Sequence, residues 1–474
     1  MEQIVDRFIE KHQLLKQGAT VVIGVSGGPD SMALLHYFLR RQAKWKLTIV
    51  AAHVNHMLRG EQSKEDYLYV EQFCRNRNIL FEGVHIDVNA YKRKHNVTTQ
   101  AAARACRYQF FANVMEKHQA DFLALAHHGD DQIETMLMRQ TLGAWGFSRA
   151  GIPVKRPFAK GMIIRPFLCV EKTAIEQYIE QAGIVPRQDP SNESGKYVRN
   201  RFRHAVLPFL KQENPKVHEK FQQQSEWITE DETFLFSLAE QKFHELVQER
   251  DDREFIVDVN AFQSIAIPLQ RRIIQLILNY LYHFEHTDVT YVHIEQILRL
   301  FHVDHSSRML QLPANVQVIR SYDHVTFTNR IIDQKQSRFF HRVDLPFHLT
   351  LPQGVMTGEI VTQLPEADSL NVFVGDIDAI KLPLTVRSRE AGDRIYPMGM
   401  HGSKKVKAVL IDEKIERCRR DLIPIVEDAN GNILWIAGVK RAKFGLVSDK
   451  TSKYLYIKYQ AYNGEELNLD GDGK

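Results

Sequence analysis

The sequence predicts an N-terminal α/β domain with a doubly wound parallel sheet, then a mainly helical domain and a small α+β C-terminal domain. Apolar, β-branched runs over 21–25, 46–52, 80–86 and 121–126 are typical of buried strands. Helical patterns separate these runs, and strands that alternate with helices favour a parallel sheet covered on both faces. From about residue 209 onward, helical patterns replace the alternation, which indicates a second domain.

The length and net charge of the chain limit the number of domains and the kinds of partner that it can have. Its 474 residues are enough for two to four domains. We expect domains at 1–208, 209–344 and 385–474, with 345–384 as a linker. The net charge of +4 permits an anionic partner without requiring one, so the distribution of charge matters more than its sum.

Cysteine usage and hydropathy predict a cytoplasmic protein. Cys74, Cys106, Cys169 and Cys418 form no Cys-x-x-Cys pair, which argues against a zinc site, an iron–sulfur cluster or a disulfide framework. The first ten residues form an amphipathic pattern without the basic start and apolar core of a signal peptide. No apolar run reaches membrane-spanning length, so we expect no membrane partner.

A glycine-rich turn after the first strand predicts a phosphate site. Its glycines let backbone amides approach a phosphate closely, and the start of the next helix adds unpaired N–H groups. Two serine hydroxyls add donors, and the aspartate can hold a cation or a water. No lysine follows the glycines, so the loop is not a Walker A loop, and an ordinary turn is the alternative. The loop consists of Ser26, Gly27, Gly28, Pro29, Asp30 and Ser31.

Polar residues follow two other predicted strands, where open α/β sheets bind ligands. His53 and Asn55 follow the second strand and are candidate nucleotide contacts, or plain loop residues. The fourth strand leads into a helix through a His-His-x-Asp-Asp cluster. Asp131 and Glu134 have the spacing of a capping box, which does not explain the rest of the cluster. The cluster could bind Mg²⁺ or supply acid–base groups, and it comprises His127, His128, Asp130, Asp131 and Glu134.

Arginines accompany these candidate sites. Arg104 and Arg107 lie three residues apart on a predicted helix and therefore share one face, which suits a phosphate or a developing negative charge. A solvated basic face is the alternative. Arg139 lies one turn beyond the acidic cluster, and Arg165 ends another strand. The basic segment 187–203 suits an RNA backbone clamp or a solvated linker, and its candidate residues are Asp189, Asn192, Arg199, Asn200 and Arg203.

Together these motifs resemble the tRNA(Ile)-lysidine synthetase family within the PP-loop ATP pyrophosphatases. The first loop is common to the whole superfamily, whereas Ala-His-His-x-Asp-Asp-Gln-x-Glu-Thr and Tyr-x-Arg-Asn-x-x-Arg are far more selective. The resemblance reaches a tail domain of the longer members, and one departure is Leu-Gly-Ala-Trp-Gly at 142–146, where the family often has Arg-Gly-Ser-Gly. The matching stretches are 26–31, 53–59, 103–108, 127–135, 139, 165–166, 189–192, 197–203, 387–394 and 433–439.

The resemblance implies ATP-dependent ligation of lysine to C2 of the wobble cytidine in the CAU anticodon of tRNA(Ile). AMP would be transferred to the C2 oxygen with release of pyrophosphate, and the ε-amino group of free lysine would then displace AMP. The product, lysidine, changes pairing from AUG to AUA and charging from methionine to isoleucine. ATP and Mg²⁺ are the implied cofactors.

Residue roles follow from the same resemblance. The loop 26–31 would hold the ATP phosphates, with His53, Asn55 and His127 as further nucleotide contacts. Asp30 and Asp131 would organise Mg²⁺. Arg104 and Arg107 would stabilise the adenylated intermediate, and Asp130 and Glu134 would seat the lysine ammonium or take its proton. Arg139, Arg165 and the candidates within 187–203 would bind the RNA.

In the remainder of the chain, the sequence pattern predicts modules that bind RNA. A long, mostly polar helix over 217–246 precedes a helical module with a small hairpin region at about 306–328, and this helix would allow a homodimer. Residues 385–448 carry thirteen Lys and Arg against eight Asp and Glu. We expect this module to contact the tRNA backbone, and a solvated surface is the alternative.

Two other functions compete with the ligase. Another PP-loop tRNA-modifying enzyme, such as a thiolase, would need a cysteine carrier or a Cys-ligated cluster, against which the scattered cysteines argue. A non-enzymatic RNA-binding protein with a relic ATP fold should have lost its loop acids, yet Asp30, Asp130 and Asp131 are present.

Overall fold

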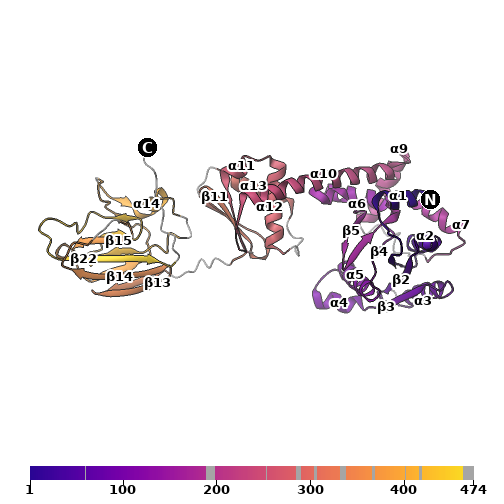
Figure 1. The fold of residues 1–474 in the computed structure, drawn as a ribbon, viewed down its shortest axis with the longest axis horizontal. Helices are drawn as coiled ribbons and strands as arrows, with labels where there is room; N and C mark the ends of the chain where they lie inside the picture. Colours follow the sequence, from indigo (N-terminus) through magenta and orange to yellow (C-terminus); the bar gives the residue numbers. More distant parts are fainter. Residues whose placement is uncertain are drawn as a thin grey trace. The chain divides into compact units, whose positions relative to one another are not determined.

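The structure is a computed structural model in which the chain forms two compact units, Met1–Phe236 and Ser237–Lys474 (Figure 1). Each unit is described by itself. Among the described residues no helix combines the length and the apolar character needed to cross a membrane. The described residues are 1–58, 60–187, 198–251, 253–283, 290–303, 307–330, 338–365, 369–400, 402–415 and 419–462.

The first unit contains a six-stranded sheet in the order β3-β2-β1-β4-β6-β5. Neighbouring strands are parallel except for β5 and β6, which pair antiparallel. The predicted parallel α/β fold is therefore confirmed. The chain crosses from one side of β1 to the other between β3 and β4, which creates a switch point where such sheets bind ligands. The strands are β1 (Thr20–Gly24), β2 (Thr48–Asn55), β3 (Leu80–His85), β4 (Phe122–Ala124), β5 (Lys155–Phe158) and β6 (Gly161–Ile164).

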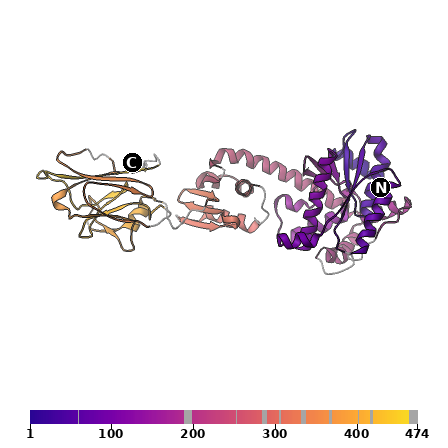
Figure 2. The ribbon, with the colours of Figure 1, turned by 90° about the horizontal axis from the view of Figure 1, so that it is seen from below.

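Helices cover both faces of this sheet (Figure 2). Alternate side chains of β1 enter different cores, because successive residues of a strand point to opposite faces. Val21 and Ile23 pack with Phe38 of α2, whereas Val22 packs with Phe111 of α5. The helices are α1 (Glu2–His12), α2 (Pro29–Trp45), α3 (Glu61–Arg75), α4 (Val88–His95), α5 (Thr99–Lys117), α6 (Gly129–Thr141), α7 (Lys172–Gln181), α8 (Val198–Arg201), α9 (Leu207–Glu213) and α10 (Val217–Leu246).

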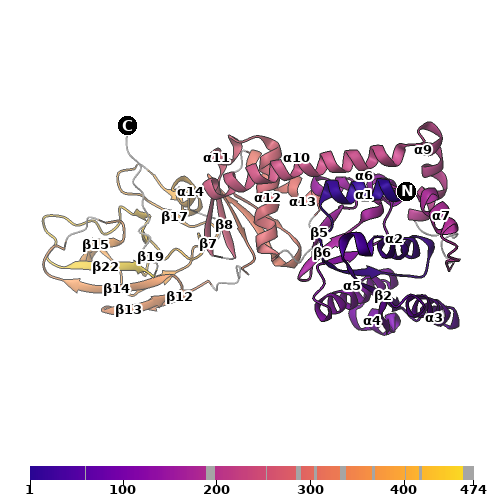
Figure 3. The same cartoon turned by 45° about the vertical axis from the view of Figure 1, so that its right-hand side comes forward.

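The helix α10 is one uninterrupted helix over the predicted residues (Figure 3). Glu226 ties α10 to α1, accepting hydrogen bonds from Lys11 Nζ at 2.5 Å, His12 Nε2 at 3.1 Å and Gln222 Nε2 at 3.0 Å. Burial opposes ionisation of Glu226, but these donors outweigh it and lower its pKa from 4.5 to about 2. The charged carboxylate therefore stabilises the fold above the unfolded-state pKa, and this stabilisation is lost as the pH falls toward 2.

We expect Glu226→Gln to lower the free energy of unfolding by about 1.5–3 kcal/mol near neutral pH, the range for a hydrogen bond to a charged group. The difference from the unsubstituted protein should shrink as the pH falls from 4.5 to about 2, because the native carboxylate is then protonated as well. Urea unfolding across this pH range measures the effect. A difference that stays constant with pH would contradict the assignment.

The second unit begins with a five-stranded antiparallel sheet beside three helices. The sheet order is β7-β8-β11-β10-β9, so the predicted hairpin region extends into a larger sheet than expected. Phe262 and Phe301 stack with ring centroids 4.0 Å apart in the core of this part. The elements are β7 (Val247–Asp251), β8 (Glu254–Asp258), α11 (Val259–Gln263), α12 (Ile267–Leu281), α13 (Tyr291–His302), β9 (Ser307–Gln311), β10 (Gln317–Ser321) and β11 (His324–Thr328).

The C-terminal part is strand-rich, with sheets in the orders β12-β16-β19-β20-β21 and β13-β14-β22-β15 and a short β17-β18 pair. Buried side chains of the two larger sheets, Met356, Phe373, Trp435 and Ile457 among them, form a common core. The elements are β12 (Phe340–Val343), β13 (Phe347–Leu351), β14 (Gly354–Val361), β15 (Val372–Asp376), β16 (Leu384–Arg387), β17 (Arg394–Ile395), β18 (Lys404–Lys405), α14 (Val406–Asp412), β19 (Ile425–Glu427), β20 (Ile433–Ile436), β21 (Lys440–Arg441) and β22 (Tyr454–Ala461).

The segment 345–384, expected as a linker, is built into one of these sheets. Its strands β14 and β15 both pair with β22, from the end of the chain. Gly354, Met356 and Gly358 of β14 are buried and the residues between them are partly exposed, as the two-residue period of a strand predicts. The expectation missed the sheet because the partner strand lies about seventy or more residues away, and local patterning carries no information about so distant a partner.

Candidate active site

The glycine-rich loop closes between β1 and α2 through hydroxyl bonds. Ser26 N donates to Ser31 Oγ at 3.0 Å, the two serine Oγ atoms lie 3.1 Å apart, and Ser31 Oγ donates to the Gly28 carbonyl at 3.1 Å. Gly27 has a φ of +89°, which L side chains rarely adopt. The sequence therefore folds into a tight turn that delivers the start of α2, with its partial positive charge, to the surface of a cavity.

Two cavities meet at this loop. The first, of about 560 Å³, is lined by charged side chains, and the second, of about 610 Å³, lies over the ends of β1, β2 and β4. Both are lined by Ser26, Asp30, Ser31 and Asp66. A molecule that filled both cavities would pass directly over the loop.

The second cavity is lined mainly by apolar side chains and imidazoles, with Asp30, Asp66 and Arg107 as its charged residues. Burial lowers the pKa of His56 to about 4 and that of His127 to about 3, so neither ring is charged near neutral pH. His53 is buried and donates from Nδ1 to the Val25 carbonyl at 2.8 Å. Such a lining suits a neutral heterocycle better than a charged group.

The strand β2 is longer than the sequence indicated, so His53 and Asn55 lie on it and not beyond it. Asn55 uses its amide within the protein. Its Nδ2 donates to the Ser63 carbonyl at 3.0 Å and its Oδ1 accepts from Met57 N at 2.9 Å. Both side chains line the second cavity, and Asn55 also shapes the loop after β2.

The predicted acids of the first cavity lie on α2 and α6, and Asp66 and Glu176 line the cavity from α3 and α7. The capping box of α6 differs from the predicted one, because α6 begins at Gly129 with His128 as its N-cap. Asp131 Oδ2 therefore accepts from His128 N at 3.1 Å, as the third residue of the helix. Glu134 falls in the second turn and takes no part in the cap.

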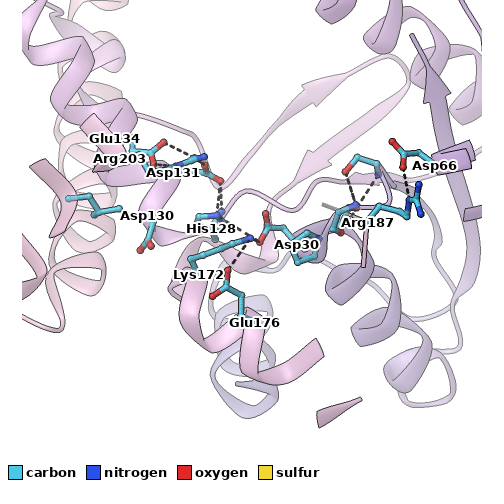
Figure 4. A pocket seen from close by; sticks show the side chains of 15 residues that line it. Asp30, Asp66, His128, Asp130, Asp131, Glu134, Lys172, Glu176, Arg187 and Arg203 are labelled. Carbon is cyan, nitrogen blue, oxygen red and sulfur yellow. Dashed lines mark hydrogen bonds and ion pairs between the residues drawn. The ribbon is translucent and has the colours of Figure 1, made fainter. Parts of the chain in front are cut away.

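Each of the predicted acids has a basic partner. Figure 4 shows two of these pairs, Asp30 with Lys172 and Glu134 with Arg203. Lys172 Nζ donates to Asp30 Oδ1 at 2.6 Å, and Lys211 Nζ donates to Asp130 Oδ2 at 2.8 Å. Arg199 donates to Asp131 Oδ1 at 2.8 Å and to Glu134 Oε2 at 2.7 Å. Arg203 donates two hydrogen bonds to Glu134, from Nε to Oε1 at 2.7 Å and from Nη2 to Oε2 at 3.1 Å.

The surroundings of Asp131 favour its charged form. Burial opposes ionisation of Asp131, but the charges of His128 and Arg199 outweigh it and hold its pKa well below the usual range.

Sequence patterning missed Lys172 and Lys211, which reach Asp30 and Asp130 from α7 and α9. It also missed Arg187, which lines the first cavity and whose Nε donates to Asp66 at 2.9 Å. Single lysines and arginines on helices carry no local signal of such partners.

A second arginine cluster surrounds the Tyr108 ring. The guanidinium carbons of Arg104, Arg107 and Arg156 lie 4.7, 5.9 and 5.6 Å from the ring centroid. Burial raises the pKa of Tyr108, and the charges of Arg104, Arg165 and Arg107 outweigh it to give a net lowering. Arg107 lines the second cavity beside Tyr108, so positive charge borders the cavity that suits a neutral ring.

Arg139 and Arg165 donate to backbone carbonyls. Arg139 Nη1 donates to the Gly151 carbonyl at 2.5 Å, and Arg165 Nη1 donates to the Pro153 carbonyl at 2.6 Å. Both therefore brace the segment between α6 and β5. Neither side chain lines either of the two cavities described above, although the charge of Arg104 acts on Arg139 and on Arg165.

The structure thus places most of the predicted site residues in the glycine-rich loop or in the lining of the two cavities beside it. Asp189 and Asn192 lie outside the described residues, and Gly27 lies in the loop without lining a cavity. Arg104, Arg139, Arg165, Arg199 and Asn200 do not line either cavity. The first cavity is lined by Ser26, Gly28, Pro29, Asp30, Ser31, Asp130, Asp131, Glu134 and Arg203. The second is lined by Ser26, Asp30, Ser31, His53, Asn55, Arg107 and His127.

A largely parallel sheet whose first strand is followed by Ser-Gly-Gly-Pro-Asp-Ser defines the class of PP-loop, ATP-using proteins. The family model for the PP-loop domain matches residues 1–210. The models for the TilS substrate binding domain and the TilS substrate C-terminal domain match residues 258–326 and 384–457. The chain belongs to the tRNA(Ile)-lysidine synthase family, which confirms the resemblance seen in its motifs.

Relatives match over almost the whole chain. The tRNA(Ile)-lysidine synthase of Geobacillus kaustophilus is 47% identical over 458 residues, covering 96% of this chain and 98% of the relative. The tRNA(Ile)-lysidine synthase of Bacillus subtilis is 43% identical over 460 residues, covering 96% of this chain and 97% of the relative. A solved structure of the TilS C-terminal domain is 36% identical and covers 27% of this chain and 99% of that one, with a TM-score of 0.26.

Proposed function

We propose that this chain ligates free lysine to C2 of the wobble cytidine in the CAU anticodon of tRNA(Ile), converting ATP to AMP and pyrophosphate. The observation that carries the proposal is the loop shared by two cavities, one lined mostly by charged side chains and the other by more apolar side chains. The relatives matched along the full chain carry the name of this activity. A base activated over the loop could then be attacked by an amine held in the charged cavity.

The first step transfers AMP to the cytidine O2. In this proposal the second cavity takes the adenosine, with His53, Asn55 and His127 around it, and the loop residues 26–31 hold the phosphates. Arg104 and Arg107 stabilise the charge that develops on the adenylated base. Positive charge near the second cavity supports these two roles.

Asp30 and Asp131 are the proposed Mg²⁺ ligands. The described residues contain no group of three or more metal-ligating side chains. Two carboxylates fit Mg²⁺ in such a site, because this ion is commonly bound by one or two carboxylates together with substrate phosphates and water. When bound, the ion would neutralise charge on the departing pyrophosphate.

The second step forms the C2–N bond and breaks the C2–O bond, so that AMP leaves. The lysine ε-amino group has a pKa of about 10 in water and must lose a proton before it can attack. Asp130 and Glu134 are the proposed seats for a lysine ammonium or acceptors of its proton. Both residues are buried and line the first cavity.

The remaining assignments concern the RNA. Arg139, Arg165, Asp189, Asn192, Arg199, Asn200 and Arg203 are proposed to bind it or to support the segment that does. Arg199 already bonds to Asp131 and Glu134, which favours a positioning role for it. The domains proposed at 209–344 and 385–474 would hold the tRNA body, with strands from 345–384 completing the latter.

The activity can be tested directly. Purified protein with ATP, Mg²⁺, labelled lysine and tRNA(Ile) bearing a CAU anticodon should place label in the RNA, and the same tRNA with uridine at the wobble position should stay unlabelled. ATP–pyrophosphate exchange should depend on the tRNA. Absence of label with the CAU tRNA would contradict the proposal.

The thiolase alternative is not favoured. Of the described cysteines, Cys74 and Cys106 are buried, and neither they nor Cys169 line a cavity at the loop. A sulfur transfer would need a cysteine or a Cys-ligated cluster at that point.

A further inference from the structure

A fully buried carboxamide lies on the far side of α6 from two of its acids. Gln132 follows Asp131 in the chain, and none of its surface is exposed. Because successive helix residues are about 100° apart, Gln132 points away from the side of α6 that carries Asp130 and Glu134. It lines neither of the two cavities. Its role must therefore lie in what it binds within the protein.

The Gln132 amide joins α6 to the segment 150–152 and to α10. Its Oε1 accepts from Ile152 N at 2.6 Å, and its Nε2 donates to the Ile152 carbonyl at 3.1 Å. Toward α10, Nε2 donates to Ser225 Oγ at 2.8 Å. Ser225 Oγ in turn donates to the Ala150 carbonyl at 2.5 Å. Three elements thus meet at one buried point, and Figure 3 shows α6 beside α10.

The segment 150–152 and the residue before it are fitted closely to both helices. Gly151 has a φ of +75°, and a Cβ there would lie 2.5 Å from Gln132 Oε1. Arg139 of α6 donates to the Gly151 carbonyl at 2.5 Å. On the other side, Arg149 donates to Glu232 of α10 at 2.7 Å, and the Glu232 side chain is fully buried. The segment therefore links α6 to α10.

Apolar contacts by themselves would not fix the place of α6 on α10. Ile133 of α6 and Val217 of α10 belong to one apolar cluster, and Leu137 and Phe221 pack against it. Hydrophobic contact is non-directional, so this cluster holds the helices together but tolerates small shifts. A satisfied buried polar network instead specifies one arrangement. We infer that the bonds of Gln132 select the position of α6.

The position of α6 sets the geometry of the first cavity. Asp131 Oδ2 accepts from His128 N of its own helix, so the carboxylate moves with the first turn of α6. Asp30 lies in the first turn of α2, and its Oδ1 is 4.0 Å from His128 Nε2. A shift of α6 would therefore misplace Asp131 relative to Asp30. In an active site a misplacement of about 1 Å can cost about 10²-fold in rate.

We propose that Gln132 is a positioning residue for the adenylation step and that it acts together with Ser225. The assignment rests on the proposed function. Neither side chain contacts ATP or the RNA. They hold the start of α6 against α10, so that Asp131 already stands opposite Asp30 when ATP binds. Loss of these bonds slows the step without weakening the binding of ATP.

Two variants test the proposal by tRNA-dependent ATP–pyrophosphate exchange. Gln132→Met keeps the length of the side chain and should lower kcat by about 10²-fold. Ser225→Ala removes the hydroxyl on α10 and should lower kcat by about tenfold, the effect of one lost hydrogen bond. It carries the test if Gln132→Met fails to fold. In both variants the KM for ATP should stay within about twofold. An unchanged kcat, or a loss that appears in KM alone, would overturn the proposal.

The double variant tests whether the two residues act as one unit. Its loss of kcat should be smaller than the product of the two single losses, because both changes break the same network. Losses that multiply would show two independent effects and would overturn the joint role of Gln132 and Ser225.

Glu226→Gln is the matched control. Glu226 follows Ser225 on α10, and its bonds go to Lys11 and His12 of α1 and to Gln222 of its own helix. The change therefore weakens the hold on α10 without removing a bond to α6. Its kcat for ATP–pyrophosphate exchange should stay within about twofold of that of the unsubstituted protein. A loss equal to that of Gln132→Met would mean that any loosening of α10 suffices, which would contradict the assignment.

Amide hydrogen–deuterium exchange, measured without ATP or tRNA, gives a readout that does not depend on activity. The amides of α6 should exchange faster in Gln132→Met than in Glu226→Gln, because the network that holds α6 is lost only in the first variant. Equal protection of α6 in the two variants would overturn the proposal. If the unsubstituted protein itself showed no tRNA-dependent ATP–pyrophosphate exchange, the proposed function would be wrong, and the protection of α6 would still test its attachment to α10.

Discussion

Asp131→Asn is expected to lower tRNA-dependent ATP–pyrophosphate exchange by about 10²- to 10³-fold, the range for loss of one group in a preorganised site. The carboxylate is 13% exposed and is held by His128 N and Arg199, so its position is set before any ligand arrives. Asparagine has nearly the same shape but lacks the charge for Mg²⁺. The exchange assay isolates the adenylation step, because it needs no lysine.

A matched control comes from the same cavity. Glu176 lines it, but its side chain is 54% exposed and lies 3.9 Å from Lys172. Exposed ion pairs contribute little free energy. The rate of ATP–pyrophosphate exchange by Glu176→Gln should therefore stay within about twofold of that of the unsubstituted protein. Thermal unfolding of both variants separates a catalytic effect from a loss of fold. Full exchange by Asp131→Asn would contradict its assignment.

Reversing the charges of Lys405 and Lys407 is expected to weaken tRNA binding by about tenfold or more at low salt. Both side chains are exposed at the start of α14, within the basic stretch of the C-terminal domain. If each lysine neutralises one phosphate, the slope of log affinity against log salt should fall by about two when both become glutamate. Binding measured between low and physiological salt gives both quantities.

The double variant Lys453→Glu and Lys458→Glu is the control, since it makes the same change of charge elsewhere on the domain. Lys458 is exposed on β22, and the double variant should affect binding less. Equal losses in the two double variants would indicate a general charge effect. Substitution is preferable to deleting 385–474, because that deletion would remove β22 from β14 and β15.

Much of the fold could be predicted because its signals are local. Strands of the first sheet appear as short β-branched runs, and the loop after β1 needs glycine at the positive φ of Gly27. Residues at the ends of parallel strands meet at one edge of a sheet, so His127 and Asp131 could be expected near Asp30. The sequence by itself therefore determined the class of fold, the family and the neighbourhood of the site.

The tertiary structure alone decided which charges meet. Lys172, Lys211 and Arg203 reach their acids across 142, 81 and 69 positions, and helical periodicity places a lysine on a face without naming its partner. The same limit hid the pairing of β14 with β22. Sequence patterns also could not show that Asp130 has an oxygen without a hydrogen-bond donor among the described residues. Whether a buried atom finds a hydrogen-bond partner depends on all the residues that the fold packs around it.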